Sequence, residues 1–296
     1  MNLSKIWFIG TGQFAALCLE NLVAVHHLHF EKIITGLPTR SGRNNKELPS
    51  HVELKANELG LAVTRTGKLN DNAELIDALA TNTPDIIFVI DFGQIIKPPF
   101  LDAMCLNIHP SLLPKYRGAA PIQRALLNGE EFTGVSVFRL VKAMDAGEIL
   151  AQEKFTIPEN YSASDLYTKL AEIGCDIAVE ALKKFPDLTF TPQDEEQASY
   201  ADKLSKDEFE LTQSMTAKNF CDTVRALDMS GGAYIILDGK RVKIWRACLS
   251  SGDSKNPELA CSDSSVELVE VQSEGKKRTT GQEWSRGLRT NKRHPD

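Results

Sequence analysis

The segment IWFIGTGQFA, residues 6–15, decides the fold of this chain. Its first four residues are large and apolar, which indicates a buried strand, and the Gly10-Thr11-Gly12 turn leads into a helix with apolar positions at Phe14 and Leu17. The same change of pattern recurs along the chain, with strands expected at 33–34, 62–63 and 85–90 and helices at 52–59 and 73–81. Strands that alternate with helices predict an α/β fold with a Rossmann-like, mainly parallel sheet.

The turn from Gly10 to Ala15 also matches the GxGxxA form of the dinucleotide-binding fingerprint. An NAD-dependent oxidoreductase is therefore one alternative. The fingerprint includes an acidic residue near the end of the second strand, where it binds the ribose. Here the second strand is followed by Thr35-Gly36-Leu37. Because that acid is missing, a tight turn and close helix packing explain the glycines better, and no NAD is expected.

Unusual polar chemistry follows at the end of another expected strand, in the stretch CLNIHPSLLPKYRGAAPIQ, residues 105–123. Side chains alternate faces along a strand, so Leu106 and Ile108 pack on one face while Asn107 and His109 project together from the other. Pro110 ends the strand. Ligands of open α/β sheets bind at the carboxyl ends of the strands, so this amide and imidazole predict a site.

The pattern changes near residue 190. Before it, strands are expected at 135–140 and 149–157 and helices at 119–128 and 163–185. Residues 191–205 read as a polar linker, and beyond them a helix at 217–227 is followed by short strands at 233–237, 242–247 and 266–271 with an Asp238-Gly239 hairpin turn. We therefore expect two domains, residues 1–190 and 206–296, the second a small β-barrel.

The charge of −6 is unevenly distributed. Residues 206–296 carry 15 Lys plus Arg and 14 Asp plus Glu, whereas residues 1–205 carry 19 and 26. The basic end is compatible either with a phosphate-binding surface or with a solvated tail. The six cysteines form no CxxC pair, and no apolar run reaches membrane-spanning length, so a cytoplasmic protein without disulfides, zinc or a membrane partner is expected.

The polar stretch at 107–123 resembles the signature of the folate-dependent formyltransferases, and most closely that of the enzymes acting on methionyl-tRNA. The similarity continues at residues 133–137, 144–150, 199–204 and 274–278. It implies a formyltransferase catalytic domain followed by an OB-like domain that binds tRNA. It also implies the activity: transfer of the formyl group of 10-formyltetrahydrofolate to the α-amino group of methionine on initiator methionyl-tRNA, for translation initiation.

The resemblance assigns catalysis to Asn107, His109 and Asp145. Formyl transfer to an amine passes through a tetrahedral oxyanion, which needs hydrogen-bond donors and a route for the amine's proton. Asn107 offers an amide donor, and His109 can donate to the oxyanion or relay a proton near neutral pH. Asp145 lies on a turn between two expected strands, from which it is expected to accept from His109 or bridge to the amine. No metal is required.

Two loops are expected to bind the folate, and a third to bind the tRNA. The first two follow neighbouring strands at one sheet edge, with Asp91-Phe92 departing from the small residue and tyrosine usual in the family. The expected folate-binding residues are Phe88, Val89, Ile90, Asp91, Phe92, Gly93, Ser111, Leu112, Leu113 and Pro114. The tRNA loop contributes Arg40, Arg43 and Lys46.

Two alternatives remain. A sugar-nucleotide N-formyltransferase would use the same donor and the same three catalytic residues, with a different acceptor. A noncatalytic tRNA- or folate-binding protein would need none of them. Residues 227–232 depart from the prolines and aromatic usual in the family, which affects the second domain. A monomer is expected.

Overall fold

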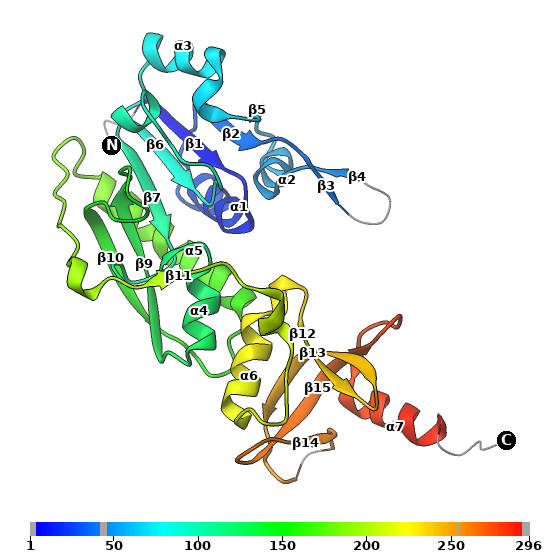
Figure 1. Cartoon of the computed structure of the whole chain (residues 1–296). Coiled ribbons are helices and arrows are strands. Elements are labelled where there is room, and N and C mark those ends of the chain that lie inside the picture. Colours follow the sequence, from blue (N-terminus) through cyan, green and yellow to red (C-terminus); the bar gives the residue numbers. More distant parts are fainter. Residues whose placement is uncertain (1–3, 42–45, 254, 292–296) are drawn as a thin grey trace. The chain divides into compact units, whose positions relative to one another are not determined.

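In the described part of the computed structural model, residues 4–41, 46–253 and 255–291, seven strands form one sheet in the order β10-β9-β7-β6-β1-β2-β5 (Figure 1). Five of them run parallel, whereas β9 is antiparallel to β7 and β10 is antiparallel to β9. The strands are β1 Ile6–Gly10, β2 Lys32–Gly36, β5 Thr64–Thr66, β6 Ile86–Ile90, β7 Cys105–His109, β9 Phe132–Arg139 and β10 Ile149–Thr156. The mainly parallel Rossmann-like sheet is confirmed.

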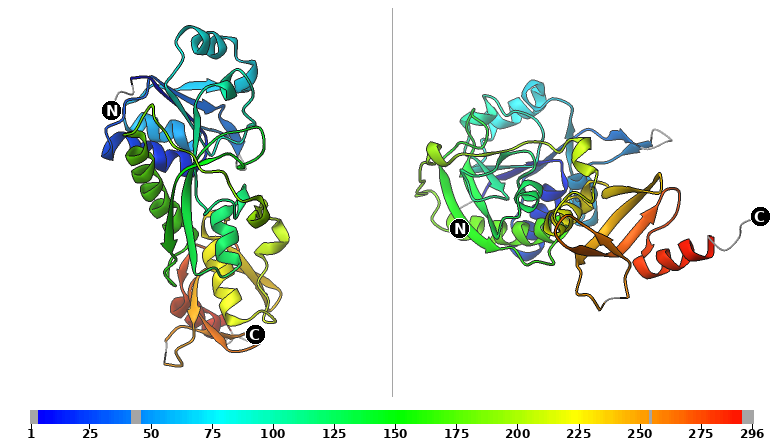
Figure 2. Two further views of the ribbon diagram at one scale, coloured as in Figure 1. Left: turned by 90° about the vertical axis from the view of Figure 1, so that its left-hand side faces the viewer. Right: turned by 60° about the horizontal axis from the view of Figure 1, so that its bottom comes forward.

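Helices cover both faces of this sheet. On one face α1 (Gln13–Glu20) lies beside α5 (Ala163–Leu182), where the rings of Phe14 and Tyr167 meet edge to face at 5.9 Å (Figure 2). Helix α2 (His51–Glu58) packs against α1. A side chain at Gly174 of α5 would collide with Ile108, so α5 approaches β7 closely.

The opposite face of the sheet carries α3 (Ala73–Thr81). Its Leu75 and Leu79 belong to a buried cluster that includes Trp7, Ile87 and Val89 from β1 and β6. In β1, β6 and β7 the odd-numbered residues therefore face α3, and the even-numbered ones face α1 and α5. This arrangement confirms the alternation expected for residues 105–109.

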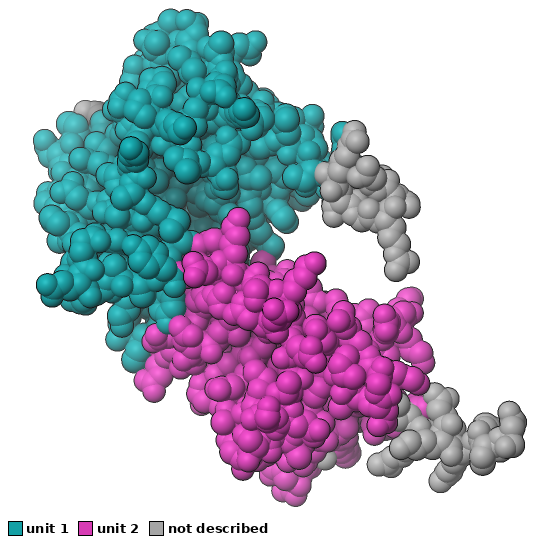
Figure 3. All heavy atoms as spheres, in the orientation of Figure 1, with its two compact units in different colours: residues 1–118, 132–156, 167–200 teal, residues 119–131, 157–166, 201–296 magenta. Residues whose placement is uncertain are grey.

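The chain divides into two compact units (Figure 3). The first comprises residues 1–118, 132–156 and 167–200, and the second residues 119–131, 157–166 and 201–296. Two segments from the first 190 residues, 119–131 and 157–166, belong to the second unit, so the units differ from the domains expected from sequence. The domain limits 1–190 and 206–296 stay a prediction.

The second unit contains an antiparallel sheet in the order β12-β13-β15-β14, with β16 paired to β15. Its strands are β12 Ala233–Leu237, β13 Lys240–Leu249, β14 Glu258–Ala260, β15 Ser265–Ser273 and β16 Thr279–Thr280. Helix α6 (Ala217–Ala226) packs on it, and α4 (Pro121–Leu127) packs on α6. Among these residues the barrel is open, so the expected OB-like domain takes the form of a half-barrel.

Several short elements were not expected from the sequence. A hairpin joins β3 (Thr39–Ser41) and β4 (Lys46–Leu48), β8 (Arg117–Gly118) pairs with β11 (Tyr200–Ala201), and α7 spans Gly281–Asn291. Single turns of 3₁₀ helix occur at Leu69–Asp71, Phe100–Asp102, Glu195–Gln197, Lys206–Phe209 and Asp228–Ser230, and a π-helical turn at Asn21–Val25. The strand expected at 62–63 was placed wrongly, because the structure has it at Thr64–Thr66. Across the described ranges, none of the helices combines the length and apolarity needed to cross a bilayer.

Candidate active site

His109 ends β7 at the carboxyl edge of the sheet. Its side chain is buried, and the ring of Phe138 meets it edge to face at 6.4 Å. The Nε2 atom lies 2.9 Å from the backbone carbonyl oxygen of Tyr116. A carbonyl only accepts, so Nε2 carries the hydrogen in the neutral ring and Nδ1 keeps its lone pair. The imidazole is thus oriented by backbone, with one nitrogen free for proton transfer.

Asp145 lies opposite that free nitrogen. Its Oδ2 is 3.9 Å from His109 Nδ1, too long for a hydrogen bond but within range of a charge interaction. The same oxygen accepts a 2.8 Å hydrogen bond from the backbone N–H of Gly118. Asp145 itself has φ 50°, a conformation that L residues rarely adopt. The structure therefore places Asp145 near His109 without a direct hydrogen bond between them, and Tyr116 binds the other ring nitrogen. The expected bridge from Asp145 to the amine stays a prediction.

Asn107 projects from the same face of β7 as His109. Its Nδ2 donates to the carbonyl oxygen of Val89 in β6 at 2.7 Å. The second N–H of the amide is available, since an amide nitrogen carries two. Its Oδ1 is buried and has no hydrogen-bond partner among the described residues. A buried polar atom without a partner is unusual in a folded protein, and a ligand that supplies a donor would satisfy it.

The two expected folate loops follow β6 and β7, which are parallel neighbours, so both lie at the same sheet edge. Residues 88–90 end β6, and Phe92 and Leu113 are buried. The loop at 111–114 is held by the hydroxyl of Ser136, which accepts from Leu113 N–H at 3.0 Å and donates to Ser111 O at 2.7 Å. Gln152 adds a 2.9 Å hydrogen bond to Leu113 O. These hydrogen bonds fix the backbone of Ser111 and Leu113 within the loop.

Asp91 explains why the glycine-rich turn is unsuited to a dinucleotide. Its backbone oxygen accepts from the N–H groups of Thr11 and Gly12 at 3.1 and 3.0 Å. Its carboxylate accepts from the N–H groups of Phe14 and Ala15 at the start of α1, and burial raises the pKa of Asp91. A side chain at Gly12 would collide with this carboxylate. The donors that bind pyrophosphate in dinucleotide proteins are thus already bound to an acid.

The expected tRNA loop is a short hairpin. The backbone of Arg40 in β3 pairs with Glu47 in β4, and that of Ser41 pairs with Lys46. Arg43 lies outside the described residues. Of the three expected positions, Arg40 and Lys46 therefore lie on the two paired strands of this hairpin.

Sequence reasoning missed several residues that hold the site. Arg117 is 2% exposed and binds Gln193 and Glu195, which fall in the expected linker. Ser199 accepts from Tyr116 N–H at 3.0 Å, and its own carbonyl accepts from Arg117 N–H at 2.9 Å. None of these positions has a periodic pattern. Arg117 lies within the resemblance at 107–123 and Ser199 begins the one at 199–204, but neither resemblance indicated these contacts.

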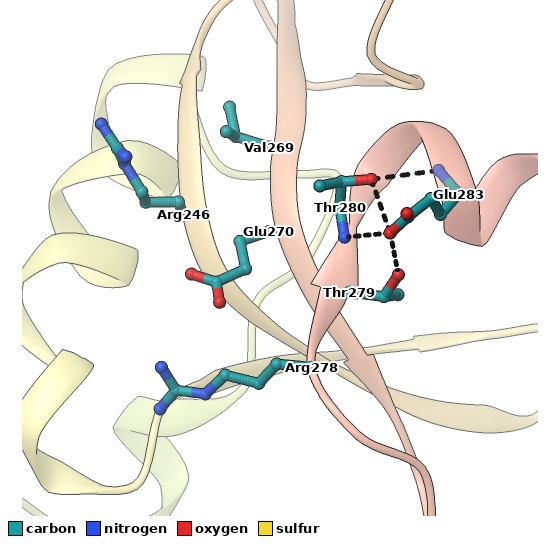
Figure 4. A pocket seen from close by; sticks show the side chains of 7 residues that line it. All are labelled: Arg246, Val269, Glu270, Arg278, Thr279, Thr280 and Glu283. Atoms are coloured by element: carbon teal, nitrogen blue, oxygen red, sulfur yellow. Dashed lines mark hydrogen bonds between the residues drawn. The ribbon is translucent and has the colours of Figure 1, made fainter.

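The described residues include no group of three or more His, Cys, Asp or Glu arranged to bind a metal. A cavity of about 430 Å³ lies in the second unit, where Glu283 accepts hydrogen bonds from Thr279 and Thr280 (Figure 4). Its lining residues are Arg246, Val269, Glu270, Arg278, Thr279, Thr280 and Glu283. A second cavity, of about 470 Å³, adjoins the loop at Gln94 and Ile95 in the first unit. Neither cavity is lined by Asn107, His109 or Asp145.

An amide, an imidazole and a carboxylate at the carboxyl edge of an open α/β sheet supply the donors and the proton acceptor that a group-transfer enzyme needs. Residues 4–182 match the family described as formyl transferase, and residues 203–289 match the formyl transferase C-terminal domain. The chain belongs to the formyl transferase family of enzymes.

Relatives of similar length carry a more specific name. A methionyl-tRNA formyltransferase of Lactobacillus johnsonii is 35% identical over 302 residues, covering 96% of each chain. Another, of Paracoccus denitrificans, is 34% identical over 293 residues, covering 96% of this chain and 97% of the relative.

Solved structures share the fold at lower identity. A methionyl-tRNA formyltransferase from Clostridium thermocellum has a TM-score of 0.63 at 15% identity and covers 94% of this chain and all (100%) of its own. WlaRD, a sugar 3N-formyl transferase solved with dTDP and 5-N-formyl-THF, has a TM-score of 0.62 at 19% identity, with 94% and 100% covered. HypX from Aquifex aeolicus in complex with tetrahydrofolic acid has a TM-score of 0.64 at 18% identity and covers 96% of this chain, which spans about half (46%) of the HypX chain.

Proposed function

We propose that this protein transfers the formyl group of 10-formyltetrahydrofolate to the α-amino group of methionine on initiator tRNA. The observation that carries the proposal is the arrangement of Asn107, His109 and Asp145 at the carboxyl edge of the sheet, with a free imidazole nitrogen 3.9 Å from a carboxylate. Relatives named methionyl-tRNA formyltransferase, 35% identical over 96% of the chain, support this acceptor.

In the proposed mechanism His109 moves the proton. As the amine nitrogen bonds to the formyl carbon, Nδ1 of His109 takes a proton from that nitrogen. The carboxylate of Asp145 then stabilises the imidazolium, since it lies 3.9 Å away in a largely buried place. When the carbonyl re-forms and the bond to the folate nitrogen breaks, His109 returns the proton to that nitrogen, which leaves tetrahydrofolate.

Asn107 acts on the other charge that develops. The second Nδ2–H of Asn107 donates to the oxyanion, while the first stays on the carbonyl of Val89 and fixes the amide in place. The unpartnered Oδ1 accepts from an N–H group of the substrate. Donors held rigidly toward a developing charge are the most effective, because they need no reorganisation during the reaction.

The folate donor suits the two loops that follow β6 and β7. Phe92 and Leu113 are apolar and buried beside these loops, and Ser136 and Gln152 hydrogen-bond the backbone of Leu113. Flat ligands bind to surfaces of this composition, apolar with a few fixed polar groups. Two structural neighbours were solved with folates, which supports the same donor class here.

A face of the second unit supports a nucleic-acid acceptor. Val242 and Ile244 of β13 are buried, so the residues between and beside them point away from the core. On that outward face Arg241 lies over the ring of Tyr234 at 3.9 Å, and Lys243 and Arg278 lie over Trp245 at 5.4 and 3.3 Å. Cations stacked on aromatic rings give both phosphate attraction and base-stacking surface.

The alternative acceptor is an amino-sugar nucleotide, supported by the fold shared with WlaRD. The stacked cations on β13 favour tRNA, because a sugar nucleotide carries too few phosphates to occupy such a surface. A binding-only protein would have no use for the free nitrogen of His109.

The test supplies labelled 10-formyltetrahydrofolate together with methionylated initiator tRNA and an amino-sugar nucleotide. We expect the label on the tRNA, bound to methionine. Label on the sugar would contradict tRNA as the acceptor but support formyl transfer from the folate. Label on neither acceptor would favour a binding protein. The cytoplasmic location and the monomeric state stay predictions.

A further inference from the structure

The segment 116–118 contacts His109 through its first residue and Asp145 through its third. Tyr116 accepts from the imidazole through its carbonyl oxygen at 2.9 Å, and Gly118 donates its N–H to the carboxylate at 2.8 Å. Between them, Arg117 points its guanidinium into the protein, where it is 2% exposed. Contacts that hold Arg117 in place therefore also hold the two neighbouring residues that bind His109 and Asp145.

The side chain of Gln193 binds both Arg117 and the turn that carries Asp145. Its Oε1 accepts from Arg117 Nε and Nη2 at 3.1 and 2.7 Å. Its Nε2 donates to the backbone oxygens of Asp145 and Gly147 at 2.8 and 2.7 Å. All the hydrogen-bonding capacity of this one amide is used, with two bonds to each side.

The turn needs such support. Asp145 has φ 50°, and an L residue in this conformation is held there only when surrounding contacts determine it. Gln193 supplies two of those contacts, both to backbone oxygens of the turn and neither to the carboxylate of Asp145. Glu195 pairs with Arg117 at 2.7 and 2.9 Å and keeps the guanidinium in place from the other side.

We propose that Gln193 is a positioning residue for the proposed formyl transfer: it holds the turn so that the carboxylate of Asp145 stays opposite His109 Nδ1. The inference rests on the proposed function for its chemistry. Gln193 contacts neither His109 nor the side chain of Asp145 directly, so its effect passes through the backbone of the turn. It therefore acts on the rate of the chemical step and leaves acceptor binding unchanged.

Two variants of Gln193 test its support of the turn separately from its contact with Arg117. Gln193→Glu can still accept from Arg117 but cannot donate to the carbonyls of Asp145 and Gly147. Gln193→Leu removes all four bonds without adding a charge, and it serves if the glutamate variant fails to fold. Gln197→Leu is the matched control, because Gln197 is in the same segment and, within the described part of the chain, its side chain donates to Asp194 alone.

We expect Gln193→Glu to lower kcat by roughly 10- to 100-fold, the scale of a small misplacement of a catalytic group, with KM for methionylated tRNA unchanged. In an Asp145→Asn background the same change costs less than about threefold, because the carboxylate that it positions is gone. A residue that merely stabilised the fold would cost the same factor in both backgrounds. Equal factors in the two backgrounds would overturn the inference. So would a Gln193→Glu variant with unchanged kcat, or one that changes only KM.

A readout without turnover separates this inference from the proposed function. The imidazole nitrogen resonances of His109 report the nearby carboxylate, and we expect them to move in Gln193→Glu or Gln193→Leu but not in Gln197→Leu. Resonances that stay at the wild-type positions in both Gln193 variants would overturn the positioning role. Absence of any wild-type transfer to methionylated tRNA would instead count against the function alone.

Discussion

Asp145→Asn removes the negative charge beside His109 while keeping the shape of the side chain. The asparagine oxygen can still accept from Gly118 N–H, which binds the aspartate at 2.8 Å, so we expect no measurable change in thermal stability. The variant loses the attraction between the carboxylate of Asp145 and the imidazolium of His109 that forms during proton transfer. At 3.9 Å, that attraction is about 4 kcal/mol with an effective dielectric constant of roughly 20.

Each 1.4 kcal/mol corresponds to about a factor of ten in rate, so the full term equals about three orders of magnitude. Some water reaches this partly exposed carboxylate, and we therefore expect kcat to fall by roughly 100- to 1,000-fold. The assay is single-turnover transfer of a labelled formyl group to methionylated tRNA, with both substrates saturating. Glu148→Gln is the control, since this neighbouring carboxylate pairs with Arg139 at 3.7 Å on the surface. A kcat within about threefold of wild type for Asp145→Asn would refute the role of its charge.

Other variants test the remaining parts of the site and the fold. Asn107→Ala is expected to lower kcat by roughly 100-fold or more, as the loss of an oxyanion donor does, and an unchanged single-turnover rate would remove Asn107 from that role. Arg241→Ala and Arg278→Ala should each raise KM for the tRNA and reduce the slope of log affinity against log salt by up to about 0.9. The control Lys183→Ala, in the turn after α5, should change neither, and an unchanged KM at low salt in the arginine variants would exclude this face. Arg124 lowers the pKa of Glu208 from 4.5 to about 2, so this pair stabilises the protein above about pH 4.5 and the contribution is lost as pH falls toward 2. In urea unfolding, Glu208→Gln should therefore cost about 1 kcal/mol at pH 7 and less at pH 3, and a cost independent of pH would contradict the ion pair.

Much of the first unit could be predicted because its signals are local. The alternation of apolar residues at 105–109 placed Asn107 and His109 on one face, and parallel neighbouring strands placed the loops after 90 and 109 at one edge. In the second unit, the hairpin turn at Asp238-Gly239 could also be predicted from its residue types, and both residues adopt positive φ. In each case the residue types at fixed spacing determine the local structure.

The contacts that hold the site could not be predicted in this way. The hydrogen bonds of Gln193 join residues 46 to 76 positions apart in the chain, and a loop that is fixed by such bonds has no periodicity. The acid at Asp91 was noticed as a departure from the family, but its place at the start of α1 depends on the fold. Short or strongly charged elements, such as β3, β4 and α7, read as loop or tail because they contain few apolar residues.

The most direct test of the central claim compares the wild-type protein with His109→Ala. Both are given labelled 10-formyltetrahydrofolate and methionylated initiator tRNA, and binding of the tRNA is measured in the same preparations. We predict formylmethionine on the tRNA with wild type, and at least about a 100-fold lower rate with unchanged tRNA binding in the variant. No transfer by the wild-type protein, or equal transfer by the variant, would contradict formyl transfer at this site.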